Sequence, residues 1–263
     1  MQRLLSDRAA VGLTLPVIVW IVAVLWCDQY VSTLGQLGLG VVTWALLLLL
    51  LARESGLVRA QTIVVIVMAT IIEYTFSGWL EVYIYRLHHV PAYVPPGHGL
   101  VYLAALGLSR SAVVRRWPGW AIGVTLIVAG SYAAWGLFLS PRPDALGAFW
   151  FLCLVGFMVW GRSQLLYVGA FAVVTFLELL GTHWGIWTWQ ANDPTGLVSI
   201  GNPPSGAAGG YGWFDLVAVM LAPSIVAGIQ RLQKRPSTEE CSKPLVVTAQ
   251  PATSAGEPSK PVI

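Results

Sequence analysis

The chain has 263 residues, of which 56% are hydrophobic and only 10% are charged, whereas a soluble domain carries about 25% charged residues. With a net charge of only +3 and a mean hydropathy of +0.70, the composition excludes a soluble globular domain, a disordered chain and a nucleic-acid-binding protein. The 13 Trp residues suit a protein with aromatic anchors at both membrane interfaces. We therefore expect an all-α polytopic integral membrane protein.

Eight apolar runs approach or exceed the roughly 20 residues that a spanning helix needs. They cover residues 9–31, 36–52, 60–81, 98–114, 118–139, 146–161, 164–185 and 212–231. The first run is long enough to span, and no small-residue cleavage site follows it, so we interpret it as a membrane helix rather than a cleaved signal. The three cysteines form no CxxC pair, so neither a disulfide framework nor a zinc site is predicted.

The basic residues favour one orientation of these eight spans, because cytoplasmic loops carry an excess of Lys and Arg. With the N-terminus inside, only Arg86 and Arg142 fall in outer loops. The inner side then receives Arg3, Arg8, Arg53, Arg59, Arg110, Arg115, Arg116, Arg162, Arg231, Lys234 and Arg235. We therefore predict a protein of the plasma (cytoplasmic) membrane with both termini cytoplasmic. Residues 236–263 are too polar to fold and are predicted to form a disordered cytoplasmic tail.

Two stretches, 70–79 and 175–184, share the pattern T-x-x-E-x-x-x-[ST]-x-W. Each is followed by alternating aromatics, a long outer loop with a Pro-Pro pair, and an aromatic-Gly pair that opens the next helix. The members of this series are Tyr83, Tyr85, Pro95, Pro96, His98 and Gly99 in the first half and Trp187, Trp189, Pro203, Pro204, Tyr211 and Gly212 in the second. Four spans per half give both halves the same orientation. The sequence thus predicts two parallel four-helix repeats, 1–116 and 117–235.

The repeated pattern places one carboxylate, Glu73 or Glu178, inside a spanning helix of each half. An advance of about 100° per residue puts Thr70, Ser77 and Glu81 on the face of Glu73, and Thr175 and Thr182 on the face of Glu178. A carboxylate facing lipid is costly, so both are expected to face the bundle interior, where neighbouring hydroxyls can donate hydrogen bonds. If both faces point to one axis, the two carboxylates can act as acid and base. The alternative, equally open, is that each carboxylate binds an outer-loop backbone amide and is purely structural.

Four residues are therefore candidate catalytic groups: Glu73, Glu178, His98 and Asp215. The candidate substrate-binding residues are Thr70, Ser77, Glu81, Thr175, Thr182, His183, Trp184, Trp187 and Tyr211. No metal site is predicted, because Glu178 and His183 point about 140° apart on a helix and no ligand-spaced His motif is present. No cofactor is identified. The loop 186–211 is interpreted as an ordered lid over the bundle mouth or, alternatively, as a set of simple connecting turns.

At the two repeat cores the chain resembles two families of small multipass membrane proteins of carotenoid metabolism. Gly185-Ile186-Trp187 and the Gly/Pro-rich stretch Gly196 to Pro204 are similar to the lycopene cyclase domain family. Glu178-Leu179-Leu180-Gly181, Tyr83-x-Tyr85 and Val90-Pro91 are similar to the membrane carotenoid hydratase family. The paired Glu that follows the proline in the cyclase pattern is replaced here by Ser-Gly-Ala-Ala. The resemblance implies a membrane cavity in which carboxylates act on an apolar, polyprenoid-like substrate.

Three functions fit these features. The first is an acid/base enzyme acting on a lipid-soluble substrate, since protonation of a C=C bond needs an acid in a dry pocket and aromatic faces for the cation. The second is a non-catalytic accessory or scaffold subunit of a larger membrane complex. The third is a transporter, which the almost purely apolar inner halves of the helices disfavour. The expected partners are membrane lipids, a lipid-soluble small molecule and other membrane subunits, and no nucleic acid.

Overall fold

The computed structural model describes residues 2–233, with side chains from residue 10 onward, so the predicted tail 236–263 lies outside the described residues. The elements follow in the order α1 (Gln2–Asp28), α2 (Thr33–Leu51), α3 (Gly56–Glu73), the π-helix η1 (Tyr74–Trp79), β1 (Tyr83–Tyr85), α4 (Val94–Arg110), α5 (Ala112–Arg116), α6 (Pro118–Phe138), α7 (Ala145–Trp160), α8 (Gln164–His183), β2 (Trp187–Trp189) and α9 (Ala207–Gln233). Residues up to Ala227 form one compact unit. Of a second unit that begins at Gly228, the structure describes only the last turns of α9.

Six helices in the described chain are long and apolar enough to cross a membrane: Ala10–Asp28, α2, Gly56–Trp79, α6, α8 and α9. The protein is therefore an all-α polytopic membrane protein. Helix α7 is apolar but has only 16 residues, and α4 has 17. Each run expected from the sequence overlaps a helix, although 98–114 is divided between α4 and α5 and 60–81 passes the end of η1. Crossing by all eight stays a prediction.

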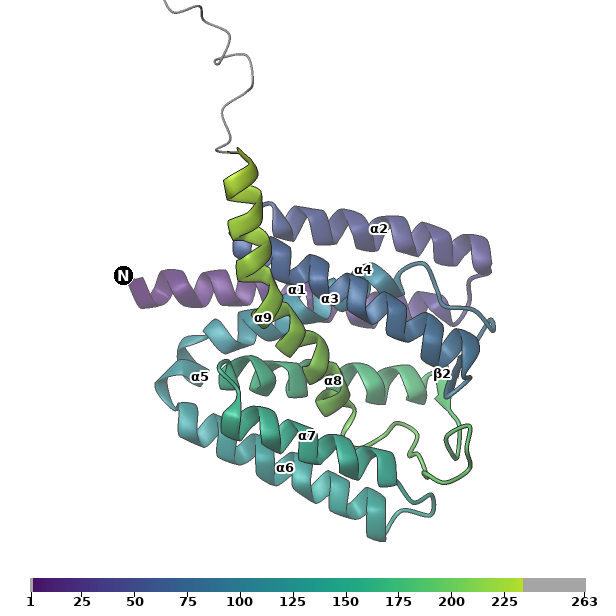
Figure 1. The fold of residues 1–263 in the computed structure, drawn as a ribbon. Helices are drawn as coiled ribbons and strands as arrows, with labels where there is room; N and C mark the ends of the chain where they lie inside the picture. The colour runs from purple at the N-terminus through teal and green to yellow at the C-terminus, as the bar shows by residue number, and fades with distance from the viewer. Residues whose placement is uncertain (1, 234–263) are drawn as a thin grey trace, which may run out of the picture. The chain divides into compact units, whose positions relative to one another are not determined.

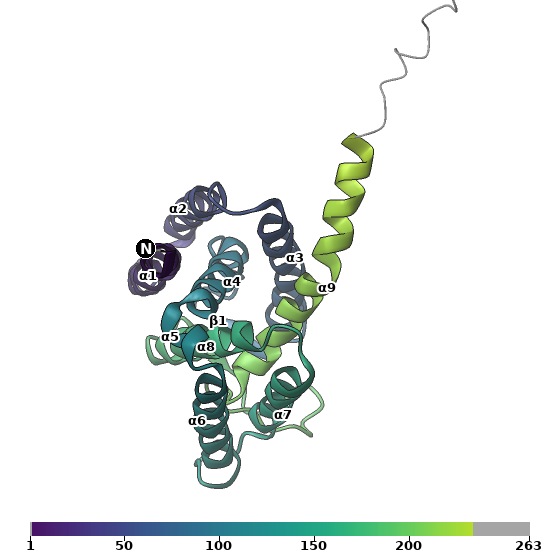
Figure 2. The same ribbon diagram turned by 90° about the vertical axis from the view of Figure 1, so that its left-hand side faces the viewer.

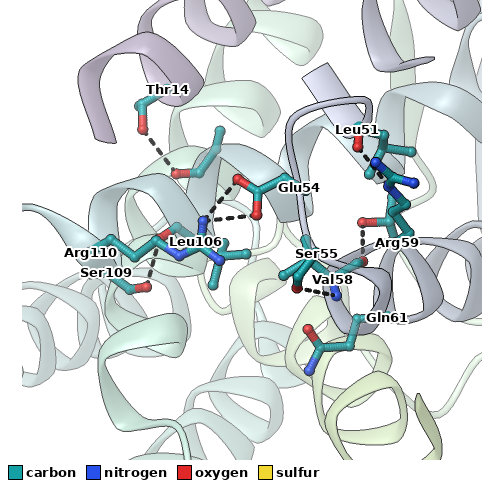
Figure 3. A network of polar contacts seen from close by, with 12 residues as sticks. Thr14, Leu51, Glu54, Ser55, Val58, Arg59, Gln61, Leu106, Ser109 and Arg110 are labelled. Carbon is teal, nitrogen blue, oxygen red and sulfur yellow. Dashed lines mark hydrogen bonds and ion pairs between the residues drawn. The ribbon is translucent and has the colours of Figure 1, made fainter. Parts of the chain in front are cut away.

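The helices run back and forth between two ends of the bundle (Figure 1). One end carries β1 and β2 and is called the sheet end below. The other end, called the arginine end, carries α5, the start of α3 with Arg59 and the end of α4 with Arg110. There Nη1 of Arg110 donates to both carboxylate oxygens of Glu54, at 2.9 and 3.1 Å (Figure 3). Arg59 caps the C-terminal end of α2 by donating to the Leu51 carbonyl. The side of the membrane on which each end lies stays a prediction.

Helix α4 lies at the centre of the first half, surrounded by α1, α2, α3 and α8 (Figure 2). Eleven of its residues are buried, from Val94 near the sheet end to Gly107. Helix α8 approaches α4 closely at Gly169, where a Cβ atom would stand 2.2 Å from the Ala105 carbonyl oxygen. Because the two helices touch without an intervening side chain, the polar groups on α4 and α8 are held at a fixed separation.

The two strands pair antiparallel, with Tyr83 opposite Trp189 and Tyr85 opposite Trp187. The repeat equates Tyr83 with Trp187 and Tyr85 with Trp189, whereas the sheet pairs each residue with the equivalent of the other. A local two-fold axis through the sheet would produce this pairing. The offset between the halves is 105 residues at the glutamates and 104 at the strands. A π-helical turn accommodates one extra residue, and η1 occurs in the first half alone among the described elements. Superposition of the complete halves 1–116 and 117–235 stays a prediction.

Candidate functional site

An apolar cavity of about 280 Å³ lies inside the bundle towards the sheet end. Aromatic and aliphatic side chains form most of its wall, with a few polar groups among them, which is the usual composition of a small-molecule site. The polar and aromatic lining residues are Trp20, Thr43, Glu73, Phe76, Tyr83, Tyr85, Tyr93, His98, Trp150, Glu178, Trp187, Trp189, Tyr211, Trp213 and Phe214. Both repeated carboxylates thus line the same cavity.

Glu73 is the last residue of α3, is only 5% exposed and accepts three hydrogen bonds. The hydroxyls of Tyr83 and Tyr85 donate to its Oε2 at 2.8 and 2.9 Å. Nε2 of His98, on the first turn of α4, lies 2.8 Å from its Oε1 and donates when Glu73 is ionised. Three converging side-chain donors form a strong binding site for a carboxylate.

The local sequence explains why these donors converge. Side chains two apart on a strand point to the same face, so Tyr83 and Tyr85 both reach the carboxylate. Burial, followed by the charge of Glu73, raises the pKa of both phenols well above the usual value of 10.0. Both phenols therefore keep their protons and remain donors.

Glu178, on α8, is 4% exposed and is held differently. The indole N–H groups of Trp187 and Trp189 donate to its Oε2 at 2.9 and 3.2 Å. Among the described residues, none donates to its Oε1. Each carboxylate thus accepts two hydrogen bonds from the strand that follows its helix. Glu178 differs from Glu73 in that its donors are neutral indoles and, among the described residues, no histidine contacts it.

His98 is fixed on two sides. Its ring stacks on Tyr211 at a centroid distance of 5.2 Å and meets the edge of Phe214 at 5.9 Å. Its Nδ1 is buried and has no hydrogen-bond partner among the described residues. The repeat equates His98 with Tyr211, and their stacked rings both form part of the cavity wall.

The structure brings five of the predicted site residues together on the cavity: Glu73, Glu178, His98, Trp187 and Tyr211. Asp215, the fourth candidate catalytic residue, lies instead beside a second, much smaller cavity that His98 also lines. The expected interior position of both glutamates is confirmed by their burial.

The expected hydroxyl donors on α3 and α8 are wrong. Thr70 donates to the Ile66 carbonyl at 2.7 Å, and Thr182 donates to the backbone carbonyl of Glu178 at 2.7 Å. A helical threonine hydroxyl readily bonds the carbonyl four residues earlier, which removes it from other acceptors. In the described part of the chain, Ser77 and Thr175 likewise make no hydrogen bond to either carboxylate.

Three further predicted residues lie away from the cavity. The expectation that Glu81 shares a helical face with Glu73 is wrong, because the helix ends at Trp79 and Glu81 is exposed with a φ of 51°. His183 is exposed at the end of α8. Trp184 packs edge-on against Trp26 of α1 at 5.6 Å.

The sequence reasoning overlooked the donors themselves. Tyr83, Tyr85 and Trp189 were recognised as part of the repeat but not as ligands of the carboxylates. Their i, i+2 alternation immediately after each glutamate helix was the available signal, since it is typical of a short strand that presents two side chains to one face. Glu73 and His98 are in contact, but no group of three or more potential metal ligands occurs among the described residues.

The loop after β2 is tied to the α6–α7 connection by two residues, Asp144 and Arg142. The Asp144 carboxylate is buried and accepts from the backbone N–H groups of Gly147, Gly201 and Ser205 at 2.6–2.9 Å and from the Ser205 hydroxyl at 2.7 Å. Arg142 donates to the Ile200 carbonyl at 2.6 Å. These contacts order the loop and argue against a series of free turns, while its role as a cover of the cavity stays a prediction.

Neither protein-family models, curated proteins nor solved structures match the chain. The resemblance to carotenoid-metabolism families therefore stays an expectation, and the function has to be argued from the site.

Proposed function

We propose that the protein is an integral membrane enzyme that moves protons on an unsaturated, lipid-soluble substrate of the polyprenoid class. The observation that carries this proposal is that two buried carboxylates from separate helices, Glu73 and Glu178, line one aromatic cavity. An acid and a base on opposite halves of one dry pocket are what isomerisation or cyclisation of an alkene requires.

The proposed reaction starts with Glu73 as the acid. Its proton bonds to one carbon of a C=C group, the π electrons form the new C–H bond, and the neighbouring carbon becomes a cation. The hydrogen bonds from Tyr83, Tyr85 and His98 stabilise the carboxylate that remains, which favours donation.

Glu178 is the proposed base. Its Oε2 is occupied by two indoles, whereas its Oε1 receives no hydrogen bond from the described residues and is available to accept a proton. Loss of a proton from carbon to this oxygen returns an electron pair and forms the rearranged double bond. Aromatic faces on the cavity wall, among them Trp150 and Phe76, favour the intermediate cation. The step needs no external oxidant or reductant.

The position of the cavity supports a substrate that arrives from the lipid. Trp20 of α1 and Trp213 of α9 form part of its wall, and Trp213 is 49% exposed on the outside of an apolar helix. A cavity of about 280 Å³ suits one end of a long isoprenoid chain, while the rest extends into the bilayer.

A structural role for the two carboxylates has a specific observation in its favour. Each glutamate binds two side chains of the strand that directly follows its helix, so each also anchors the sheet end. This contact pattern fits a non-catalytic accessory subunit as well, and a transporter using the same groups is the third alternative.

The deciding experiment compares Glu73→Gln and Glu178→Gln with Glu81→Gln, an exposed carboxyl just past the same helix. Each variant is purified from a polyprenoid-producing host, and the bound apolar compounds are identified by mass and isomer composition. The proposal predicts that wild type and Glu81→Gln carry product, whereas the two site variants, folded, carry an unconverted isomer. Identical ligands in all four proteins, or none, would overturn the enzymatic role.

A further inference from the structure

The small second cavity shares His98 and Tyr211 with the large one. It is formed by α3, α4, α8 and α9, and half of its lining residues are aliphatic. Its polar lining residues are His98, Tyr102, Tyr211 and Asp215. Its volume of about 10 Å³ matches one water molecule measured in the same way.

Two groups on this cavity need a hydrogen-bond partner. Nδ1 of His98 is buried and unpartnered, while Nε2 of the same ring is occupied by Glu73. The Asp215 side chain is 5% exposed, and no described residue hydrogen-bonds to it. A buried water requires two to four polar partners, and these two residues, with the Tyr102 hydroxyl nearby, supply them.

A series of polar side chains continues from this cavity towards the arginine end. Tyr102, one turn after His98 on α4, donates through its hydroxyl to Oε1 of Gln61 at 2.9 Å. Gln61 lies on α3 a short distance past its N-cap, Ser55. Figure 3 shows Gln61 beside Ser55 and Val58, near the start of α3. The polar groups of this region therefore extend from His98 through Tyr102 to Gln61.

We propose that Asp215 and His98 bind one water molecule in the small cavity and that this chain carries protons from the arginine end to Glu73. The inference rests on the proposed function, in which each turnover leaves Glu73 ionised and Glu178 protonated. The relay returns a proton to Glu73, and Glu178 releases the proton it took from the substrate to water at the sheet end. Asp215 is the carboxyl store of the relay and His98 is its final carrier, while Gln61 only orients the Tyr102 hydroxyl by accepting its hydrogen bond.

The proton balance of the relay is simple. Protonated Asp215 gives its proton to the water, which gives one of its own to Nδ1 of His98. The ring then releases the Nε2 proton to Oε1 of Glu73, along the existing 2.8 Å contact. The result is ionised Asp215, the other neutral tautomer of His98 and protonated Glu73, with no net charge created. Uptake of a proton by Asp215 from the arginine end and return of the ring to its first tautomer reset the chain.

Any test must distinguish the effects of the individual groups that face His98. They are Glu73 of α3, Tyr83 and Tyr85 of β1, Tyr102 of α4 itself, and Tyr211 and Asp215 of α9. Asp215→Asn removes the acid but keeps the volume and a hydrogen-bonding group. Asp193→Asn, in the outer loop, is the matched control for loss of a carboxylate.

The experiment uses the full chain in lipid nanodiscs without added substrate. The ¹⁵N signals of the ring are read in protein labelled at histidine, with His98→Asn identifying the relevant pair. Protonation of Glu73 is followed by its infrared carbonyl band after a pH jump, with Glu73→Gln identifying that band. In wild type and Asp193→Asn we expect Nδ1 to show the shift of a hydrogen-bonded nitrogen. In Asp215→Asn we expect that shift to change and protonation of Glu73 to slow on the order of tenfold or more.

A wild-type Nδ1 shift typical of an unbonded nitrogen overturns the proposal, and this reading does not depend on whether Asp215→Asn folds. Equal protonation rates in wild type and Asp215→Asn overturn it as well. Because neither measurement uses a substrate, the outcome is separate from that of the enzymatic role. An intact relay in a protein that never converts a ligand would reject only the proposed reaction. Ligand conversion in a protein whose relay measurements do not depend on Asp215 would reject only the relay.

Discussion

Tyr83 and Trp189 are direct cross-strand partners with ring centroids 4.5 Å apart, yet each hydrogen-bonds to a different buried glutamate. Tyr83 belongs to Glu73, and Trp189 belongs to Glu178. The short sheet therefore links the two carboxylates mechanically, because a shift of either strand moves the donors of both. This coupling explains how two acids from separate helices keep a fixed relation across one cavity.

The first prediction concerns this link. Trp189→Phe keeps an aromatic ring against Tyr83 but removes one donor to Glu178. Loss of a hydrogen bond to a buried charged group costs about 1.5–3 kcal/mol, so we expect a clear drop in the thermal unfolding midpoint. Trp213→Phe, at a half-exposed ring on the same cavity, is the control and should change the midpoint much less. Equal drops for the two variants would show that the indole N–H of Trp189 contributes nothing specific.

The second prediction follows from the raised pKa values of Tyr83 and Tyr85. Burial and the neighbouring Glu73 disfavour the phenolate, so neither side chain should ionise as the pH rises through 10 while the fold persists. Ultraviolet difference titration checks this, since Tyr83→Phe should leave the amplitude near pH 10 unchanged. Loss of amplitude near pH 10 in Tyr83→Phe would contradict the burial of that phenol.

The helices and both carboxylates could be predicted from the sequence, because apolar runs and the cost of a charge in lipid act locally along the chain. The partners of the carboxylates could not. Helical periodicity was extended past Glu73 to Glu81, whereas the chain turns through η1 after Glu73 and leaves the helix at Trp79. A π-helical turn changes the face of every later residue, and no local signal identified it.

The hydroxyls of Thr70 and Thr182 were misassigned for a different reason. Their spacing from the glutamates was right, but each found a nearer acceptor in its own helix. The orientation of the Tyr83 and Tyr85 hydroxyls depends instead on pairing between strands about 100 residues apart, which sequence spacing alone does not reveal.

The third prediction tests the orientation in the membrane. Leu197 is 86% exposed in the outer loop, and Val113 is 77% exposed on α5 at the arginine end. In a background without native cysteines, a cysteine at 197 should react with an impermeant thiol reagent in intact cells. A cysteine at 113 should react only after the membrane is opened, because the arginine end carries the excess of positive charge. The opposite pattern would reverse the orientation and place both sheet strands in the cytoplasm.

The fourth prediction concerns the loop after β2. The Asp144 carboxylate accepts backbone hydrogen bonds from Gly147, Gly201 and Ser205, so it joins the start of α7 to this loop. Asp144→Asn removes the charge and turns an N–H₂ group towards backbone N–H donors. We expect it to lower the free energy of unfolding by about 2–3 kcal/mol, since hydrogen bonds to a buried charge are lost.

We expect Asp144→Asn to loosen the loop without unfolding the helices. Hydrogen exchange at Gly201 and Ser205 should accelerate in Asp144→Asn, while exchange in α3 and α8 stays slow, because the loop depends on the carboxylate and the helices do not. Asp193→Asn is the control: its carboxylate accepts from Val198 within the loop but makes no bond to α7 among the described contacts. Unchanged exchange at Gly201 in Asp144→Asn would mean that Arg142, through the Ile200 carbonyl, suffices to hold the loop in place.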